Sequence, residues 1–126
     1  MLNVIENKEY KDPITPERKV FQVFDVNNQL KGRYTYYVKY DNNLERFYCK
    51  IDAITNDWLK EEQNYINDGK LLEKFRGSNN TKSIESNGFN SKEEAETFLQ
   101  ENLLVLKQWY KDKFKEDIEL SWLIIK

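Results

Sequence analysis

The fold is decided by residues 19–53, which read KVFQVFDVNNQLKGRYTYYVKYDNNLERFYCKIDA. Aromatic and β-branched residues, which favour strands, dominate this stretch. Two polar segments interrupt it, 27–32 with two asparagines and a glycine, and 41–43 with Asp-Asn-Asn. Because such residues tolerate the backbone angles of turns, the pattern predicts an antiparallel meander of three strands. These strands are expected at residues 20–26, 33–40 and 44–51.

Alternation along the second and third strands sorts their side chains onto two faces, because successive residues of a strand point in opposite directions. One face is largely apolar, and we expect it to lie in the core: Tyr34, Tyr36, Val38, Tyr40, Phe47, Cys49 and Ile51. The other face mixes basic and aromatic side chains: Arg33, Thr35, Tyr37, Lys39, Arg46, Tyr48 and Lys50.

The strongest helix signal begins at Ser91, which is followed three residues later by Glu94. Serine and glutamate at this spacing form a capping box, and Phe89 just before it is placed to pack back onto the helix. We therefore predict a long helix over 92–115. Its buried stripe is expected to contain Ala95, Phe98, Leu99, Leu103, Leu106, Trp109, Tyr110 and Phe114. Alternating apolar residues from Ile118 to Ile125 predict a C-terminal strand.

The remaining segments give weaker patterns. Pro13 and Pro16 mark residues 1–18 as a flexible arm or an edge strand. Residues 56–68 read as a helix capped by Asn56 and ended at Gly69, and 71–75 as a further helical piece or a short strand. The polar stretch 77–90 is expected to be a mobile loop, with a short strand possible near 82–85. The whole chain, 1–126, then forms a single α+β domain, in which an antiparallel sheet of four to five strands packs against one long helix and a shorter one.

Composition argues against most kinds of catalytic site. The 126 residues include no histidine and one cysteine, so the ligands of an ordinary zinc site and the base of a Ser-His or Cys-His nucleophile are missing. No glycine-rich phosphate-binding motif is present. Cys49 shares its predicted face with Phe47 and Ile51, which suits a small core residue. We therefore expect no enzyme activity, no cofactor and no metal.

The charge balance and the single cysteine suggest where the protein acts. A formal net charge of -2 is unlike the basic excess of general nucleic-acid binders. No run of apolar residues is long enough for a membrane helix, and the first residues do not resemble a signal peptide. A lone cysteine suits a reducing compartment, so we expect a cytoplasmic protein that does not bind membranes. Abundant asparagine and lysine suggest the AT-rich genome of a low-GC bacterium or its phage.

The open sheet face carries the candidate site, which consists of Arg33, Tyr37, Lys39, Arg46, Tyr48 and Lys50. The simplest interpretation of this surface is a solvated sheet face. A protein-binding face anchored by tyrosine and arginine is the second interpretation, and a nucleic-acid face is the third. Residues 19–53 carry six basic and four acidic side chains, which favours an acidic partner surface. The sequence thus predicts a small interaction protein that binds and modulates or inhibits a host protein, with nucleic-acid binding as the alternative.

Overall fold

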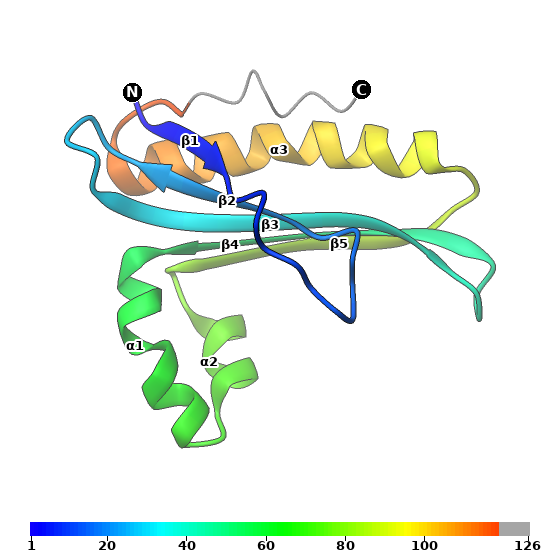
Figure 1. Cartoon of the computed structure of the whole chain (residues 1–126), viewed down its shortest axis with the longest axis horizontal. Coiled ribbons are helices and arrows are strands. Elements are labelled where there is room, and N and C mark those ends of the chain that lie inside the picture. The colour runs from blue at the N-terminus through cyan, green and yellow to red at the C-terminus, as the bar shows by residue number, and fades with distance from the viewer. Residues whose placement is uncertain (119–126) are drawn as a thin grey trace.

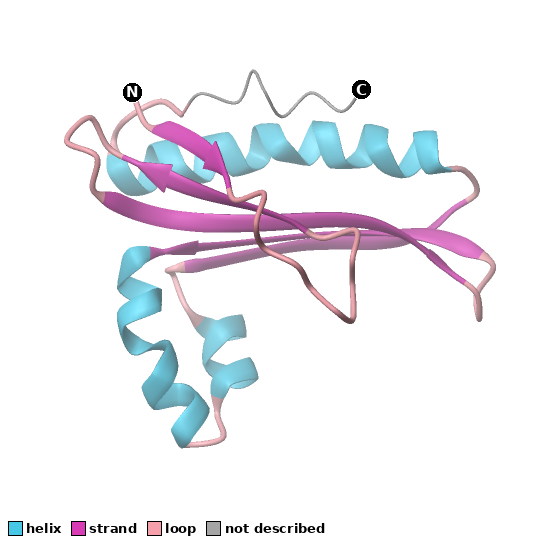
Figure 2. Ribbon diagram, in the orientation of Figure 1, coloured by secondary structure: helices cyan, strands magenta, loops and turns pink. Residues whose placement is uncertain are grey.

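The computed structural model describes residues 1–118 and shows an α+β fold. A five-stranded sheet runs in the order β1-β2-β3-β4-β5, and every neighbouring pair of these strands is antiparallel (Figures 1 and 2). The strands are β1 (Asn3–Glu6), β2 (Lys19–Phe24), β3 (Leu30–Asp41), β4 (Arg46–Thr55) and β5 (Thr81–Phe89). The helices are α1 (Asn56–Asn67), α2 (Leu71–Gly77) and α3 (Lys92–Phe114).

The predicted meander is confirmed as β2, β3 and β4. The turn after β2 places Asn28 in the left-handed region at φ 62°, which asparagine tolerates better than most residues. The register pairs Tyr34 with Ala53 and Tyr36 with Ile51, so the alternation of the sequence becomes two distinct faces. β4 runs to Thr55, beyond the predicted end at residue 51, because its pairing continues to Thr55 with β3 and to Ile54 with β5.

The core lies between one face of the sheet and α3, which covers that face and runs in roughly the same direction as the strands (Figure 1). Tyr34, Cys49 and Ile51 from the sheet are fully buried there. Of the predicted stripe on α3, five side chains are buried, namely Ala95, Leu99, Leu103, Leu106 and Tyr110, and Phe98, Trp109 and Phe114 pack against the same cluster while partly buried. The predicted inner face of the sheet is therefore correct, although Tyr40 remains 43% exposed at its far end.

The start of α3 is capped as the sequence indicates, with one difference. The Ser91 hydroxyl accepts a hydrogen bond from the Glu94 N–H at 3.2 Å. The Glu94 carboxylate accepts from the Asn90 N–H at 3.1 Å, whereas a standard capping box would use the N–H of the capping serine itself. Phe89 packs on Phe98, with ring centroids 5.3 Å apart. The entry of the helix is thus fixed by both polar and apolar contacts.

Two expectations about the middle of the chain are wrong. Residues 77–90 were expected to form a mobile loop with at most a short strand near 82–85, but Thr81–Phe89 is a nine-residue strand paired with β4. Its polar side chains conceal the strand pattern. The N-cap of α1 is Thr55 rather than Asn56, because the Thr55 hydroxyl accepts from the Trp58 N–H.

The other uncertain segments are resolved by the structure. Residues 71–75 belong to a helix, α2, and the N-terminal segment supplies the edge strand β1. Gly69 follows α1 at φ 69°, as the sequence predicted for the residue after a helix. The predicted C-terminal strand, like Trp122, lies outside the described residues except for Ile118, which bridges to Leu2.

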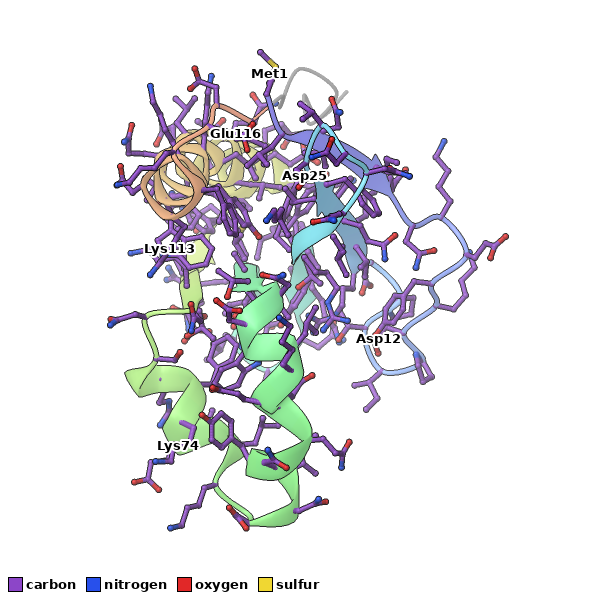
Figure 3. The ribbon with its side chains drawn as sticks, turned by 90° about the vertical axis from the view of Figure 1, so that its left-hand side faces the viewer. Met1, Asp12, Asp25, Lys74, Lys113 and Glu116 are labelled. Carbon is purple, nitrogen blue, oxygen red and sulfur yellow. The ribbon has the colours of Figure 1, made fainter. Side chains whose placement is uncertain are left out.

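The second face of the sheet is covered in part by two separate segments. The α1–α2 hairpin leaves the sheet after β4 and returns to it at β5, and the Thr55 N–H donates to the Asn80 carbonyl at 3.0 Å across its base. Residues 7–18 form a long loop between β1 and β2. Figure 3 shows the loop, marked by Asp12, and the hairpin, marked by Lys74, both projecting from the sheet away from α3.

Candidate functional site

All six predicted site residues lie on β3 and β4 and point away from α3. The register places Tyr37 opposite Lys50 and Lys39 opposite Tyr48, with Arg33 at one end of the face and Arg46 at the other. Arg46 is exposed, and the other five are half-buried. The predicted face therefore exists, but its residues do not form one continuous cluster.

The middle of this face is a network of contacts within the chain. The Tyr37 and Tyr48 rings lie 5.7 Å apart, and the Arg18 guanidinium sits 4.9 Å from the centre of the Tyr37 ring. The Tyr48 hydroxyl donates to the Glu85 carboxylate at 2.5 Å. Burial and this hydrogen bond both raise the pKa of Tyr48 above its usual range. The two tyrosines thus hold β3, β4 and β5 together and have fewer free groups to offer to a partner.

Acidic side chains neutralise part of the predicted basic character, and one of them, Glu85, lies on β5, outside residues 19–53. The Lys50 ammonium lies 3.9 Å from Asp52 and 4.0 Å from Glu85. Asp52 also accepts a hydrogen bond from the Ser83 hydroxyl at 2.8 Å. Arg46 donates to the Gly88 carbonyl at 3.3 Å. The charge of residues 19–53 alone therefore overstates the positive potential of this face.

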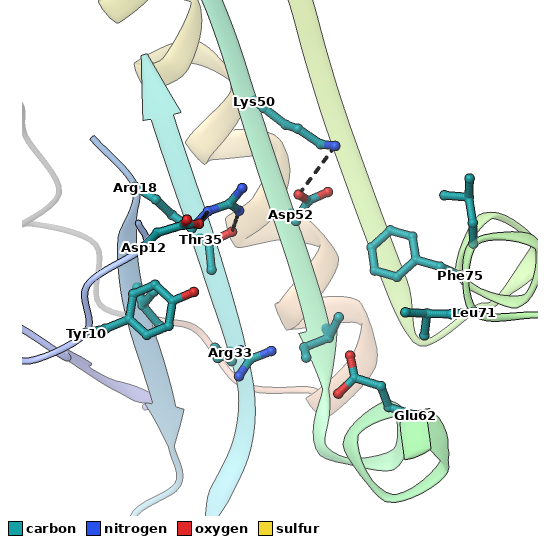
Figure 4. A pocket seen from close by; sticks show the side chains of 13 residues that line it. Tyr10, Asp12, Arg18, Arg33, Thr35, Lys50, Asp52, Glu62, Leu71 and Phe75 are labelled. Carbon is teal, nitrogen blue, oxygen red and sulfur yellow. Dashed lines mark hydrogen bonds and ion pairs between the residues drawn. The ribbon is translucent and has the colours of Figure 1, made fainter. Parts of the chain in front are cut away.

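A pocket of about 390 Å³ opens on the same face, between the loop and the hairpin (Figure 4). Its volume is at the small end of the range for ligand pockets in proteins. Arg33 and Lys50 are the predicted site residues that line it. The other lining residues come from the loop, β2 to β4 and the two helices: Tyr10, Asp12, Arg18, Val20, Thr35, Asp52, Ile54, Glu62, Leu71, Leu72 and Phe75.

The loop wall of the pocket is held in place by Asp12. Its carboxylate accepts hydrogen bonds from the N–H groups of Ile14 and Thr15 at 2.9 and 3.0 Å, which is the turn geometry that aspartate favours. The same carboxylate pairs with Arg18 at 2.9 Å, and Arg18 also donates to the Thr35 hydroxyl. The two backbone hydrogen bonds lower the pKa of Asp12 most, and the hydrogen bond and positive charge of Arg18 lower it further. This carboxylate therefore orders the loop, and its partner Arg18 links the loop to β3.

The hairpin wall is apolar apart from Glu62 and has a small core of its own. Trp58 is buried against Tyr65 and Phe75, with ring centroids 5.2 and 5.5 Å away. Leu71, Leu72 and Phe75 face the pocket from α2, and Leu72 is 61% exposed. The pocket thus sets an apolar wall against a floor and loop that carry charges of both signs.

Metal-binding groups and thiols are the reactive groups of most interest at this pocket. Among residues 1–118, no group of three or more acidic or thiol side chains is placed to hold a metal ion. Cys49 is buried on the α3 side, as expected of a core residue, and burial raises its pKa to about 12. The pocket offers hydrogen-bonding and apolar groups to a ligand, and the described residues around it include no thiol.

Sequence analysis identified Arg33 and Lys50 but not the rest of the pocket. Tyr10, Glu62 and Phe75 come from segments whose proximity no local pattern indicates. No sequence signal marked these walls, because a single exposed leucine such as Leu72 carries little information on its own.

In the part of the chain that the structure describes, no helix combines the length and the apolar character that a membrane span requires. Comparison of the chain with protein-family models, with curated proteins and with solved structures found no match.

Proposed function

We propose that this protein is a non-enzymatic binding domain that modulates a protein partner through the pocket between the 7–18 loop and the α1–α2 hairpin. The observation that carries the proposal is the pair of exposed apolar side chains on facing walls of this pocket. Tyr10 is 44% exposed on the loop and Leu72 is 61% exposed on the hairpin. Apolar surface rimmed by charged groups is typical of sites that receive another protein.

One further feature supports a protein rather than a nucleic acid. The carboxylates of Asp12, Asp52 and Glu62 line the pocket among its three cations, and closely spaced carboxylates repel a phosphate backbone. Nucleic-acid binding stays the alternative, because Lys39 and Arg46 lie at the other end of the face. Because Cys49 is its single thiol, we propose that the protein works in a reducing compartment, the cytoplasm. We propose a host protein as its partner.

The test is photocrosslinking from two matched positions. The photoreactive amino acid p-benzoylphenylalanine replaces Leu72 at the pocket or Leu104 on the outer side of α3, which is 66% exposed. Both variants are irradiated in lysate of the source cells, with and without nuclease. We expect a nuclease-resistant protein adduct from position 72 and none from position 104. Equal adducts from both positions, or none from position 72, would contradict the proposal.

Salt separates the two kinds of partner once an adduct is identified. Binding of a nucleic acid weakens by about 0.9 log unit per log unit of salt for each phosphate that is neutralised. A protein held by apolar contacts with Leu72 and Tyr10 responds far less to salt, since screening acts on charges. A steep log-linear salt dependence would therefore favour the nucleic-acid alternative.

A further inference from the structure

Two charged groups in the pocket, one basic and one acidic, form no ion pair within 4.0 Å with each other or with any other described side chain. Among residues 1–118, the side chains of Arg33 and Glu62 take part in no ion pair within 4.0 Å and in no hydrogen bond. The neighbouring cations differ, since Arg18 contacts Asp12 and Lys50 contacts Asp52. Both unpaired side chains are half-buried. Such groups are costly to desolvate further unless a ligand supplies the missing partner.

These two groups lie at the same end of the pocket, next to its apolar wall. Figure 4 shows Arg33 on β3 and Glu62 on α1 directed toward this end, with Leu71 and Phe75 beside Glu62. A guanidinium presents a fork of N–H donors that matches a carboxylate, and a carboxylate such as Glu62 accepts from N–H groups. The lining at this end is thus complementary to a ligand that carries a carboxylate, an N–H donor and an apolar group close together.

The backbone beneath Arg33 is firmly positioned. The Tyr110 hydroxyl, on the α3 side of the sheet, lies 3.1 Å from the Arg33 carbonyl oxygen and 3.3 Å from that of Ile54. Arg33 and Ile54 are direct partners across β3 and β4. The guanidinium therefore projects from a part of the sheet that is fixed from behind, which reduces the conformational cost of binding.

We propose that this end of the pocket binds an acidic side chain of the partner protein, an Asp or a Glu followed by an apolar residue. The carboxylate pairs with Arg33, the backbone N–H of the segment donates to Glu62, and the apolar side chain packs on Leu71, Leu72 and Phe75. This inference rests on the proposed function and specifies what the partner presents. An extended protein segment is favoured over a free amino acid because the exposed Leu72 and Tyr10 continue the binding surface beyond the charged end.

The test is an NMR titration of the full chain with two capped tetrapeptides, acetyl-GDLG-amide and acetyl-GNLG-amide, and with free L-aspartate. The peptides differ only in whether the central side chain is charged. We expect the aspartate peptide to shift the Arg33 side-chain N–H and the amides of Leu71 and Phe75. Its affinity should exceed that of the asparagine peptide about fivefold, as for an ion pair with modest burial. Free L-aspartate should bind more weakly than the peptide.

The matched variants are Arg33→Gln and Lys39→Gln. Both residues lie on the same face of β3, but Lys39 is outside the pocket. Arg33→Gln should abolish the preference for the aspartate peptide and Lys39→Gln should leave it unchanged, with circular dichroism confirming that both variants are folded. Equal binding of the two peptides, no shift at the pocket, or free aspartate binding as tightly as the peptide would overturn the inference. If position 72 still crosslinks a protein to the same extent in the Arg33→Gln background, the proposed function stands and only the acidic specificity fails.

Discussion

The ring of Tyr110 lies directly against Gly32. A Cβ atom on that glycine would be 3.2 Å from Cε1 of Tyr110 and 2.5 Å from the Ile54 carbonyl oxygen. The absence of a side chain at position 32 therefore lets α3 approach the sheet closely enough for the Tyr110 hydroxyl to reach the backbone of β3 and β4. This contact couples the long helix to the strand that carries Arg33.

The close approach at Gly32 makes Gly32→Ala a destabilising change. The added methyl group would overlap backbone of β4 that the sheet holds in place, and we expect a loss of about 1–3 kcal/mol in the free energy of unfolding. Gly77→Ala is the control, because a Cβ there meets nothing within 4 Å. That variant should stay within about 0.5 kcal/mol of wild type. Urea denaturation measures both, and equal stabilities would contradict the packing described here.

Two buried tyrosine hydroxyls should respond differently to removal. The Tyr110 hydroxyl donates to backbone carbonyls, so Tyr110→Phe should cost about 0.5–1.5 kcal/mol. The Tyr34 hydroxyl is buried with no hydrogen-bond partner among residues 1–118. Tyr34→Phe removes a polar group without breaking a bond, so we expect unchanged or increased stability. Urea midpoints that fall by the same amount in both variants would show that Tyr34 has a partner.

The capped start of α3 gives a third prediction. Ser91→Ala removes the acceptor of the Glu94 N–H and should destabilise the protein by about 0.5–2 kcal/mol. Ser91→Asp keeps an acceptor at this position and should restore most of the loss. Thermal unfolding followed by circular dichroism provides the measurement, and an unchanged midpoint in Ser91→Ala would mean that water satisfies the helix end equally well.

The lowered pKa of Asp12 predicts a loss of stability in acid. Because its pKa in the folded protein lies below the ordinary aspartate value of 3.8, ionised Asp12 stabilises the fold above that pH. This contribution disappears as the pH falls through the folded pKa, when the loop loses its fastening to Arg18 and to the backbone of Thr15. The Thr15 amide shift, followed by NMR from pH 6 to 2, should titrate below pH 3.8. Asp12→Asn should remove this titration while leaving the shifts of α3 unchanged.

Burial of Cys49 predicts a thiol that is unreactive in the folded protein. With its pKa raised to about 12 and no exposed surface, the thiolate is scarce and inaccessible at neutral pH. Iodoacetamide should therefore label Cys49 at pH 8 only in denaturant or at the rate of unfolding. Rapid labelling in buffer alone would show that the core opens locally at β4.

The sequence was most informative where one side of the chain is buried. Tyr34, Tyr36 and Ile51 follow the period-two pattern, and this pattern assigned both faces of β3 and β4 correctly. β5 was anticipated only as a possible short strand near 82–85, because its core-facing positions include Lys82 and Ser86 beside a single Ile84 and its alternation is weak. Its strand structure follows from pairing with β4, which is a tertiary interaction.

The candidate site was harder to predict than the fold. Its floor could be expected, since Arg33 and Lys50 lie on regular strands. Its walls come from residues such as Tyr10 and Phe75, which are brought together only when the loop and the hairpin fold over the sheet. The pairing of Lys50 with Glu85 likewise depends on β5. The net charge of residues 19–53 therefore differs from the net charge of the folded sheet face, to which β5 adds Glu85.

The hydrogen bond between Thr55 and Asn80 has an evolutionary consequence. The chain leaves the sheet at Thr55 and rejoins it at Asn80, beside the point where it left. A tight turn could therefore connect β4 to β5 in place of residues 56–79 without changing the order of the strands. Because the hairpin has its own aromatic cluster around Trp58, changes in its length or sequence can accumulate with little demand on the α3 side of the sheet. The hairpin is therefore a separable unit of the fold, whose length and sequence can change while the sheet and its long helix stay the same.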